Sequence, residues 1–173
     1  MGAARADDQT NAGASPIGEW LVAKQLARIK IVNCDGRLWG VVSWEMHPGV
    51  DSKNPDPNLR SRPTLGMPIL LGMNQSQANQ WDGQIYNSQD GNTYSANIKL
   101  LNPGTLRVEG CVFGFLCGGE NWTRVDPGDV TSNAQTRRPP ARKTRAGATP
   151  PAGDDVCLSI LGPAWLSHQR GLK

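Results

Sequence analysis

The feature that most constrains the fold of this chain is a strict alternation of apolar and polar residues, interrupted by turn signals. Residues 92–101 show it best: every second residue from Tyr94 to Leu100 is apolar, and the residues between them are polar. A period of two places successive side chains on opposite faces of a β-strand. No helical period competes with it across residues 16–125, so this region is predicted to be all-β.

Short turns separate the alternating segments. Asp35-Gly36 and Asp90-Gly91 supply the positive φ that a tight hairpin needs, and Asn102-Pro103-Gly104 turns the chain again. A long polar connection, residues 46–63, divides the third strand from the fourth. The eight predicted strands are Glu19–Ala23, Ala27–Asn33, Leu38–Trp44, Leu65–Leu71, Gln80–Asn87, Asn92–Leu101, Thr105–Val112 and Asn121–Val125.

Consecutive hairpins of this kind form an antiparallel meander. Eight strands kept flat would leave two edges exposed, and closing them into a barrel removes both edges. We therefore predict an eight-stranded antiparallel up-and-down β-barrel over residues 16–125, with a two-sheet sandwich as the alternative. A barrel of eight strands encloses its own side chains or one small ligand.

The two ends of the chain lack this pattern. Residues 1–15 are predicted to be a disordered leader, in which Ala4-Arg5-Ala6 resembles a signal-peptide cleavage site and suggests a periplasmic or secreted protein. Residues 126–173 hold six of the 13 prolines and seven Lys or Arg against four Asp. We expect a disordered Pro/Arg-rich tail. Within it, residues 156–166 are a short apolar patch that Pro163 limits to a helical turn.

Motifs for catalysis are absent from the sequence. It has no G-x-S-x-G elbow, no P-loop and no dinucleotide fingerprint, and its two histidines, His47 and His168, lie in a loop and in the tail. No apolar run reaches the roughly 18 residues of a membrane span. The basic tail lacks the interleaved aromatic residues that stack on bases. We therefore expect no enzyme activity, cofactor, metal, membrane span or nucleic-acid partner.

Several motifs together resemble a known family. They include Ile17-Gly18-Glu19-Trp20, Asn54-Pro55-Asp56-Pro57, Trp81-Asp82-Gly83-Gln84-Ile85-Tyr86 and Trp122-Thr123-Arg124. Their order and spacing over residues 16–125 resemble the bacterial domain-of-unknown-function family 2147. The resemblance implies an exported, lipocalin-like protein.

The first strand also resembles the lipocalin signature. Gly18-x-Trp20 is similar to the lipocalin motif whose Trp closes one end of the barrel, and Arg124 is similar to the Arg that lies across it. A guanidinium over an indole contributes ~0.5–2 kcal/mol. The resemblance implies a structural role for these three residues. The alternative is that Trp20 and Arg124 pack on separate neighbours.

Four cysteines are present: Cys34, Cys111, Cys117 and Cys157. Cys111 and Cys117 flank a short loop, and in an exported protein they are candidates for a disulfide. Cys34 has no obvious partner, and the chain has Trp39 where the family it resembles has a second cysteine in this hairpin. We therefore expect Cys34 to be reduced and buried.

Apolar residues expected to point inward are the main candidates for a site. They either line a cavity for a small apolar or amphipathic ligand, or fill an ordinary core and leave a structural or interaction module of the cell envelope. The candidates are Trp44, Met67, Ile69, Trp81, Tyr94, Ile98 and one of Phe113 and Phe115.

Charged residues in the long connection have two interpretations. Arg60 and Arg62 either hold an anionic head group at the barrel mouth or pair with Asp51, Asp56 or Asp82. The segment 51–62 also superficially resembles a calcium loop, but it lacks the central glycine and the final Glu, so Asx-turns are the expected structure. A cryptic enzyme built on the three Asp residues is a third alternative.

Overall fold

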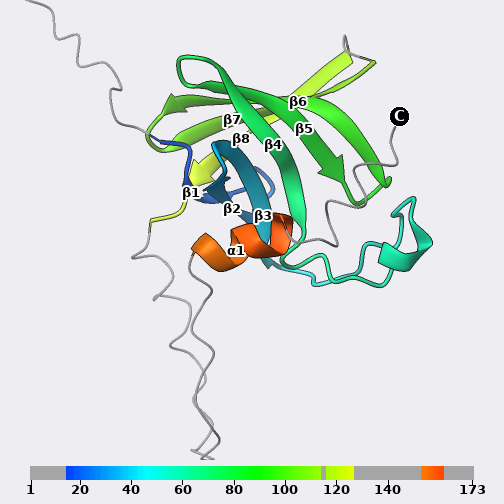
Figure 1. Ribbon diagram of the computed structural model, residues 1–173. Coiled ribbons are helices and arrows are strands. Elements are labelled where there is room, and N and C mark those ends of the chain that lie inside the picture. Colours follow the sequence, from blue (N-terminus) through cyan, green and yellow to red (C-terminus); the bar gives the residue numbers. More distant parts are fainter. Residues whose placement is uncertain (1–14, 114–115, 127–152, 162–173) are drawn as a thin grey trace, which may run out of the picture.

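The computed structural model describes residues 15–113, 116–126 and 153–161 (Figure 1). Eight antiparallel strands form one closed barrel, in which each strand pairs with the next along the chain. A short 3-10 helix, η1 (Pro57–Leu59), lies in the long connection, and α1 (Gly153–Leu161) follows the barrel. The strands are β1 (Gly18–Leu21), β2 (Ala27–Cys34), β3 (Arg37–Glu45), β4 (Pro68–Gln77), β5 (Gln80–Asn87), β6 (Asn92–Asn102), β7 (Thr105–Val112) and β8 (Leu116–Arg124).

The first and last strands close the barrel. Trp20 of β1 pairs with Arg124 of β8, and Leu21 pairs with Thr123. This pairing confirms the predicted eight-stranded barrel and excludes the two-sheet sandwich. It also gives every strand two neighbours, so no edge is left open.

The hairpin turns lie at the positions predicted from the sequence. Asp35 and Gly36, between β2 and β3, have φ of 52° and 80°. Gly91, between β5 and β6, has φ of 76°, and a Cβ there would lie only 1.9 Å from the carbonyl oxygen of Lys53. Glycine at this position therefore lets the long connection pack against the β5–β6 turn.

Several strand boundaries differ from the prediction by one to three residues, and two differ by more. β4 runs on to Gln77, because Asn74, Gln75 and Gln77 pair with β5 although their side chains are exposed and polar. β8 begins at Leu116 rather than Asn121, because Gly118 and Gly119 pair with β7 through their backbone. Glycines and polar residues have no apolar alternation, so the sequence pattern did not reveal these strand ends.

Side chains from all around the barrel fill its interior at one end. Trp20, Ile31, Met73 and Leu106 are fully buried there. Burying side chains of this size contributes ~1.5–3 kcal/mol each. This interior core positions the strand ends that form the opposite mouth of the barrel.

A second core lies on the outside of the barrel, beneath α1 (Figure 1, orange). Val156 and Ile160 of the helix pack with Val32, Val41 and other apolar residues on the outer face of the sheet. β2 and β3 are thus buried on both faces where the helix covers them. The expectation that all of residues 126–173 is disordered is therefore wrong for Gly153–Leu161, while the signal-peptide prediction falls outside the described residues.

A disulfide links the helix to the barrel. Cys34, at the end of β2, is bonded to Cys157 of α1, 123 residues later in the sequence. The prediction of a reduced Cys34 is wrong, because the outer apolar surface of β2–β4 recruits a segment that the sequence pattern did not join to the barrel. The second predicted bond, Cys111–Cys117, is confirmed and joins β7 to β8.

Candidate functional site

One end of the barrel is closed by an arginine and a tryptophan. The Arg124 guanidinium lies 4.2 Å from the centre of the Trp20 ring. It donates hydrogen bonds to the carbonyl oxygens of Ser15, Ile17 and Pro103, and the Trp20 indole donates to Pro16 at 2.8 Å. This geometry confirms the role that the lipocalin resemblance implied for the pair.

Gly18 is required at the same end. Its φ is +136°, and a Cβ would lie 2.7 Å from the Arg124 Nη1. A larger residue would push the guanidinium away from its carbonyl partners, so the three predicted structural residues act as one unit. Burial lowers the pKa of Arg124, and the nearby Asp126 opposes that shift.

The opposite end of the barrel is hollow. An open cavity of about 710 Å³, which we call the cup, extends inward from this end and is lined by residues from all of β2 to β8. Its volume lies in the range of small-molecule sites. The apolar part of its wall consists of Val22, Ile29, Val42, Met67, Ile69, Ile85, Val108 and Trp122.

Paired glycines account for part of this space. Gly110 of β7 lies directly opposite Gly118 of β8, and both line the cup. A Cβ on Gly118 would have no atom within 4 Å, whereas a Cβ on Gly110 would lie 3.2 Å from Ile85. Gly118 is exposed, so a larger side chain there would extend into open space at the cup.

Two carboxylates line the cup. Glu120 Oε1 accepts a hydrogen bond of 2.6 Å from the indole of Trp122. Glu45, at the end of β3, accepts from the Thr64 hydroxyl at 2.7 and 2.9 Å through its two oxygens. Lys24 also lines the cup, in the β1–β2 turn. The wall therefore combines apolar side chains with polar ones, which also include His47, Thr64, Asn87, Ser88 and Gln89.

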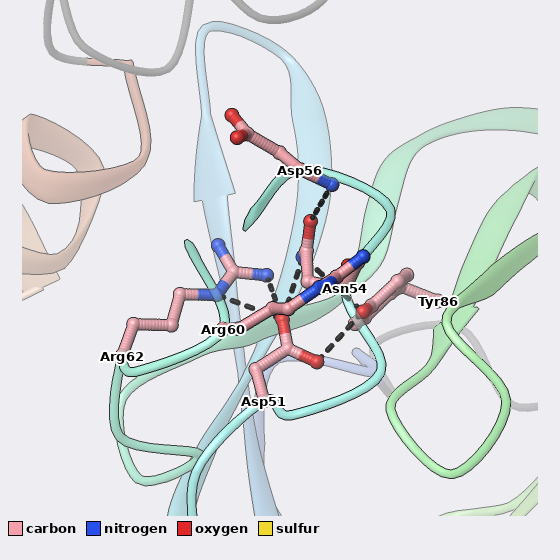
Figure 2. A network of polar contacts seen from close by, with 6 residues as sticks. All are labelled: Asp51, Asn54, Asp56, Arg60, Arg62 and Tyr86. Carbon is pink, nitrogen blue, oxygen red and sulfur yellow. Dashed lines mark hydrogen bonds and ion pairs between the residues drawn. The ribbon is translucent and has the colours of Figure 1, made fainter. Parts of the chain in front are cut away.

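Beside the barrel, a polar network anchors the long connection (Figure 2). Asp51 is fully buried, and its two oxygens accept hydrogen bonds from the Tyr86 hydroxyl and the Asn54 amide, each at 2.7 Å. Arg62 forms an ion pair with Asp51 at 2.8 Å. Burial, followed by the bond to Asp51, raises the pKa of Tyr86 to about 12.

The rest of this connection is held by its own side chains. Asn54 Oδ1 accepts from the backbone N–H of Asp56, and Asp56 Oδ1 accepts from that of Asn58, both at 2.9 Å. Arg60 donates to the Asn54 carbonyl oxygen at 2.8 Å. These bonds confirm the Asx-turn interpretation. Across the part of the chain that the structure describes, no three His, Cys, Asp or Glu residues group as metal ligands would.

Comparison with known proteins assigns this barrel to a protein family. Residues 18–124 match the model of the family described as "Uncharacterized protein conserved in bacteria (DUF2147)". The chain belongs to this family. A solved structure with a similar fold is described as "Protein HP1028 from the human pathogen Helicobacter pylori belongs to the lipocalin family"; it is 19% identical, with a TM-score of 0.63 over 68% of this chain and 88% of that chain. No curated protein matches the chain in sequence.

This DUF2147 barrel brings some of the predicted cavity residues together and separates others. Met67, Ile69 and Tyr94 line the cup, as predicted. Ile98 and Trp81, also predicted as cavity candidates, pack in the interior core and are absent from the lining of the cup. Phe113 is 83% exposed, and Phe115 lies outside the described residues.

Trp44 was also predicted to point inward and does not. It is 40% exposed, and the Arg28 guanidinium lies 5.4 Å from the centre of its ring. The strand pairing shifts here: Arg28 lies opposite Trp44, but the next residue, Ile29, lies opposite Val42. The extra residue is a β-bulge, which reverses the alternation and sends the following side chain to the other face.

The two predicted mouth arginines do not reach the cup. Arg60 and Arg62 are absent from its lining and bind the long connection instead, which confirms the alternative in which Arg62 pairs with Asp51. Sequence reasoning also missed Gly118 and Glu120. They precede Trp122 at intervals of two, and this period belongs to a strand that begins before the predicted Asn121.

Proposed function

We propose that this DUF2147 protein binds a small, mostly apolar molecule in the cup and does not catalyse a reaction. The observation that carries the proposal is a cavity of about 710 Å³, lined by apolar side chains with polar ones among them and open at one end of a barrel whose other end is packed. Apolar surface of this kind gains free energy when a ligand displaces water from it. The similarity to a lipocalin-family protein supports the same function.

The alternative is a structural or interaction module of the cell envelope that uses its loops. That function needs no interior space, so a barrel filled with side chains would favour it. Side chains fill only the end next to Trp20, and the cup occupies the other end. This arrangement favours binding inside the barrel.

A catalytic role for the Asp residues has little support. Asp51 is occupied by Tyr86, Asn54 and Arg62. Asp82 lies on β5, in a different part of the molecule, and accepts a hydrogen bond from Gln80. We therefore propose that the protein carries or senses its ligand and does not act on it as an enzyme.

We also propose that the protein works outside the cytoplasm, in the periplasm or after secretion. All four cysteines of the chain are paired in two disulfides. Such bonds persist in oxidising compartments and are rare in the bacterial cytoplasm.

Filling the cup with a side chain tests the proposed function. Gly118→Phe would place a ring where a Cβ meets nothing within 4 Å, on a strand with ordinary φ. We expect the wild-type protein to bind the neutral dye Nile red, with enhanced fluorescence, and the variant to lose at least about tenfold in affinity. The control is Gly104→Phe, in the β6–β7 turn at the closed end, which should bind as the wild type does. Equal dye binding by Gly118→Phe would contradict a site in the cup.

A further inference from the structure

A carboxylate stands on the wall of the cup. Along β8, the residues Gly118, Glu120 and Trp122 all line this cavity. Trp122 is 3% exposed and belongs to the interior core, so it forms part of the floor. Glu120 is two residues nearer to the mouth, which corresponds to about 7 Å along a strand.

This carboxylate has hydrogen-bonding capacity left over. Oε1 accepts from the Trp122 indole, and among the described residues no other donor reaches Glu120. An ionised carboxylate offers about four acceptor positions. Glu120 is half-buried, so the remaining positions are accessible to water or to a ligand.

A bound molecule changes the solvation of the Glu120 carboxylate. A ligand that fills the cup removes water from Glu120, and a buried charge without a partner is costly. A purely apolar ligand leaves that cost in place, and a carboxylic acid adds repulsion between like charges. An ammonium group satisfies both the charge and the hydrogen bonds.

The other charged groups at the cup differ from Glu120 in their position. Glu45 is the last residue of β3, so it lies at the rim of the cup, and the single hydroxyl hydrogen of Thr64 bridges its two oxygens. Lys24 and His47 lie in the segments that follow β1 and β3, next to the mouth. Glu120 lies opposite Val108, which is 3% exposed, so it is the carboxylate set farther inside the cup and the one beside the apolar part of a bound ligand.

We propose that the ligand is an amphiphilic amine, whose cationic nitrogen binds Glu120 while its apolar body lies against Val22, Ile85 and Val108. The inference rests on the proposed function, since it names the class of molecule for the same cavity. It makes Glu120 the residue that selects among ligands of equal apolar size.

Three ligands with one chain length test this selection. Decylamine, decanol and decanoic acid, used below their aggregation concentrations at neutral pH, compete with Nile red for the wild-type protein. We expect the order amine, alcohol, acid, with amine and acid separated by on the order of tenfold or more. An acid that binds as tightly as the amine would overturn the inference.

Substitutions then assign the preference to one side chain. Glu120→Gln keeps an acceptor for the Trp122 indole and removes the charge, so the amine should weaken by about tenfold while the alcohol keeps its affinity. The control Glu45→Gln should leave the order unchanged. An amine preference that survives in Glu120→Gln would overturn the inference, with the proposed function intact.

Nile red binding distinguishes a failure of the proposed function from a failure of the inference about Glu120. Nile red binding that Gly118→Phe abolishes supports the cup as a site, whatever the order of the three competitors. Failure of the wild-type protein to bind the dye or any competitor would remove the proposed function, and the inference with it.

Discussion

At the scale of single residues, the close contacts follow from chemistry that the sequence displays. Gly18, Trp20 and Arg124 could be assigned because they resemble the lipocalin motif, and the attraction between a guanidinium and an indole explains their contact. The partner of Asp51 could be narrowed to an arginine. The bond from Tyr86 could not be assigned, because it joins a loop to a strand 35 residues away.

Tyr86 gives the protein a pH dependence on the alkaline side. Its pKa rises from 10.0 to about 12 on folding, chiefly through burial and then through Asp51. The folded state therefore holds this proton more tightly than the unfolded state does. The resulting stability is fully present below pH 10 and is lost as the pH rises from 10 to 12.

Comparison of wild type with Tyr86→Phe isolates this effect. We expect the wild type to lose on the order of 1 kcal/mol more than the variant over that pH range, after allowance for solvent screening. Urea unfolding at several pH values measures the difference. The only other tyrosine, Tyr94, lies at the cup and is unchanged in both proteins. Parallel pH profiles would show that the Asp51 network does not hold the Tyr86 proton.

At the scale of elements, the strands could be predicted from the sequence, whereas the β-bulge opposite Arg28 and the helix α1 could not. The period of two placed all eight strands, because one face of each packs on the interior. The bulge opposite Arg28 follows from strand pairing rather than from local sequence, so the side on which Trp44 lies could not be predicted. α1 is only nine residues long, and its apolar residues gain little stability until they meet the outer face of β2–β4. Within the described residues no helix has the length and hydrophobicity to cross a membrane.

The disulfide to α1 should contribute more stability than the hairpin disulfide. The Cys34–Cys157 bond closes a loop of 123 residues and the Cys111–Cys117 bond closes one of six. Chain entropy alone then favours the longer link, at about 4–5 kcal/mol against roughly 2 kcal/mol. We expect the double variant Cys34→Ser/Cys157→Ser to lose more free energy of unfolding than Cys111→Ser/Cys117→Ser does.

Two measurements check this prediction. Urea unfolding compares the free energies of the two double variants with that of the wild type. Hydrogen exchange shows whether the amides of α1 lose protection when the Cys34–Cys157 link is removed, as an undocked helix should. Equal losses in both variants, with α1 still protected, would mean that helix packing through Val156 and Ile160 is sufficient without the bond.

At the scale of the whole molecule, the barrel has one packed end and one hollow end. Closure of the barrel could be predicted from the sequence, because an open sheet of eight strands would leave two edge strands with unpaired backbone groups. It could not predict the depth of the cup, which depends on where large and small side chains meet across strands. Gly110 opposite Gly118 is the clearest case, since neither glycine carries an alternation signal.

The central claim is that the cup admits a molecule, and a crystal structure of the full chain grown with decylamine tests it most directly. The account predicts electron density for the alkyl chain between Val22, Ile85 and Val108, with the nitrogen within hydrogen-bond distance of the Glu120 carboxylate. The contradicting result is a barrel whose β7 and β8 walls have moved onto Ile85 and the interior core, so that no space for the chain remains.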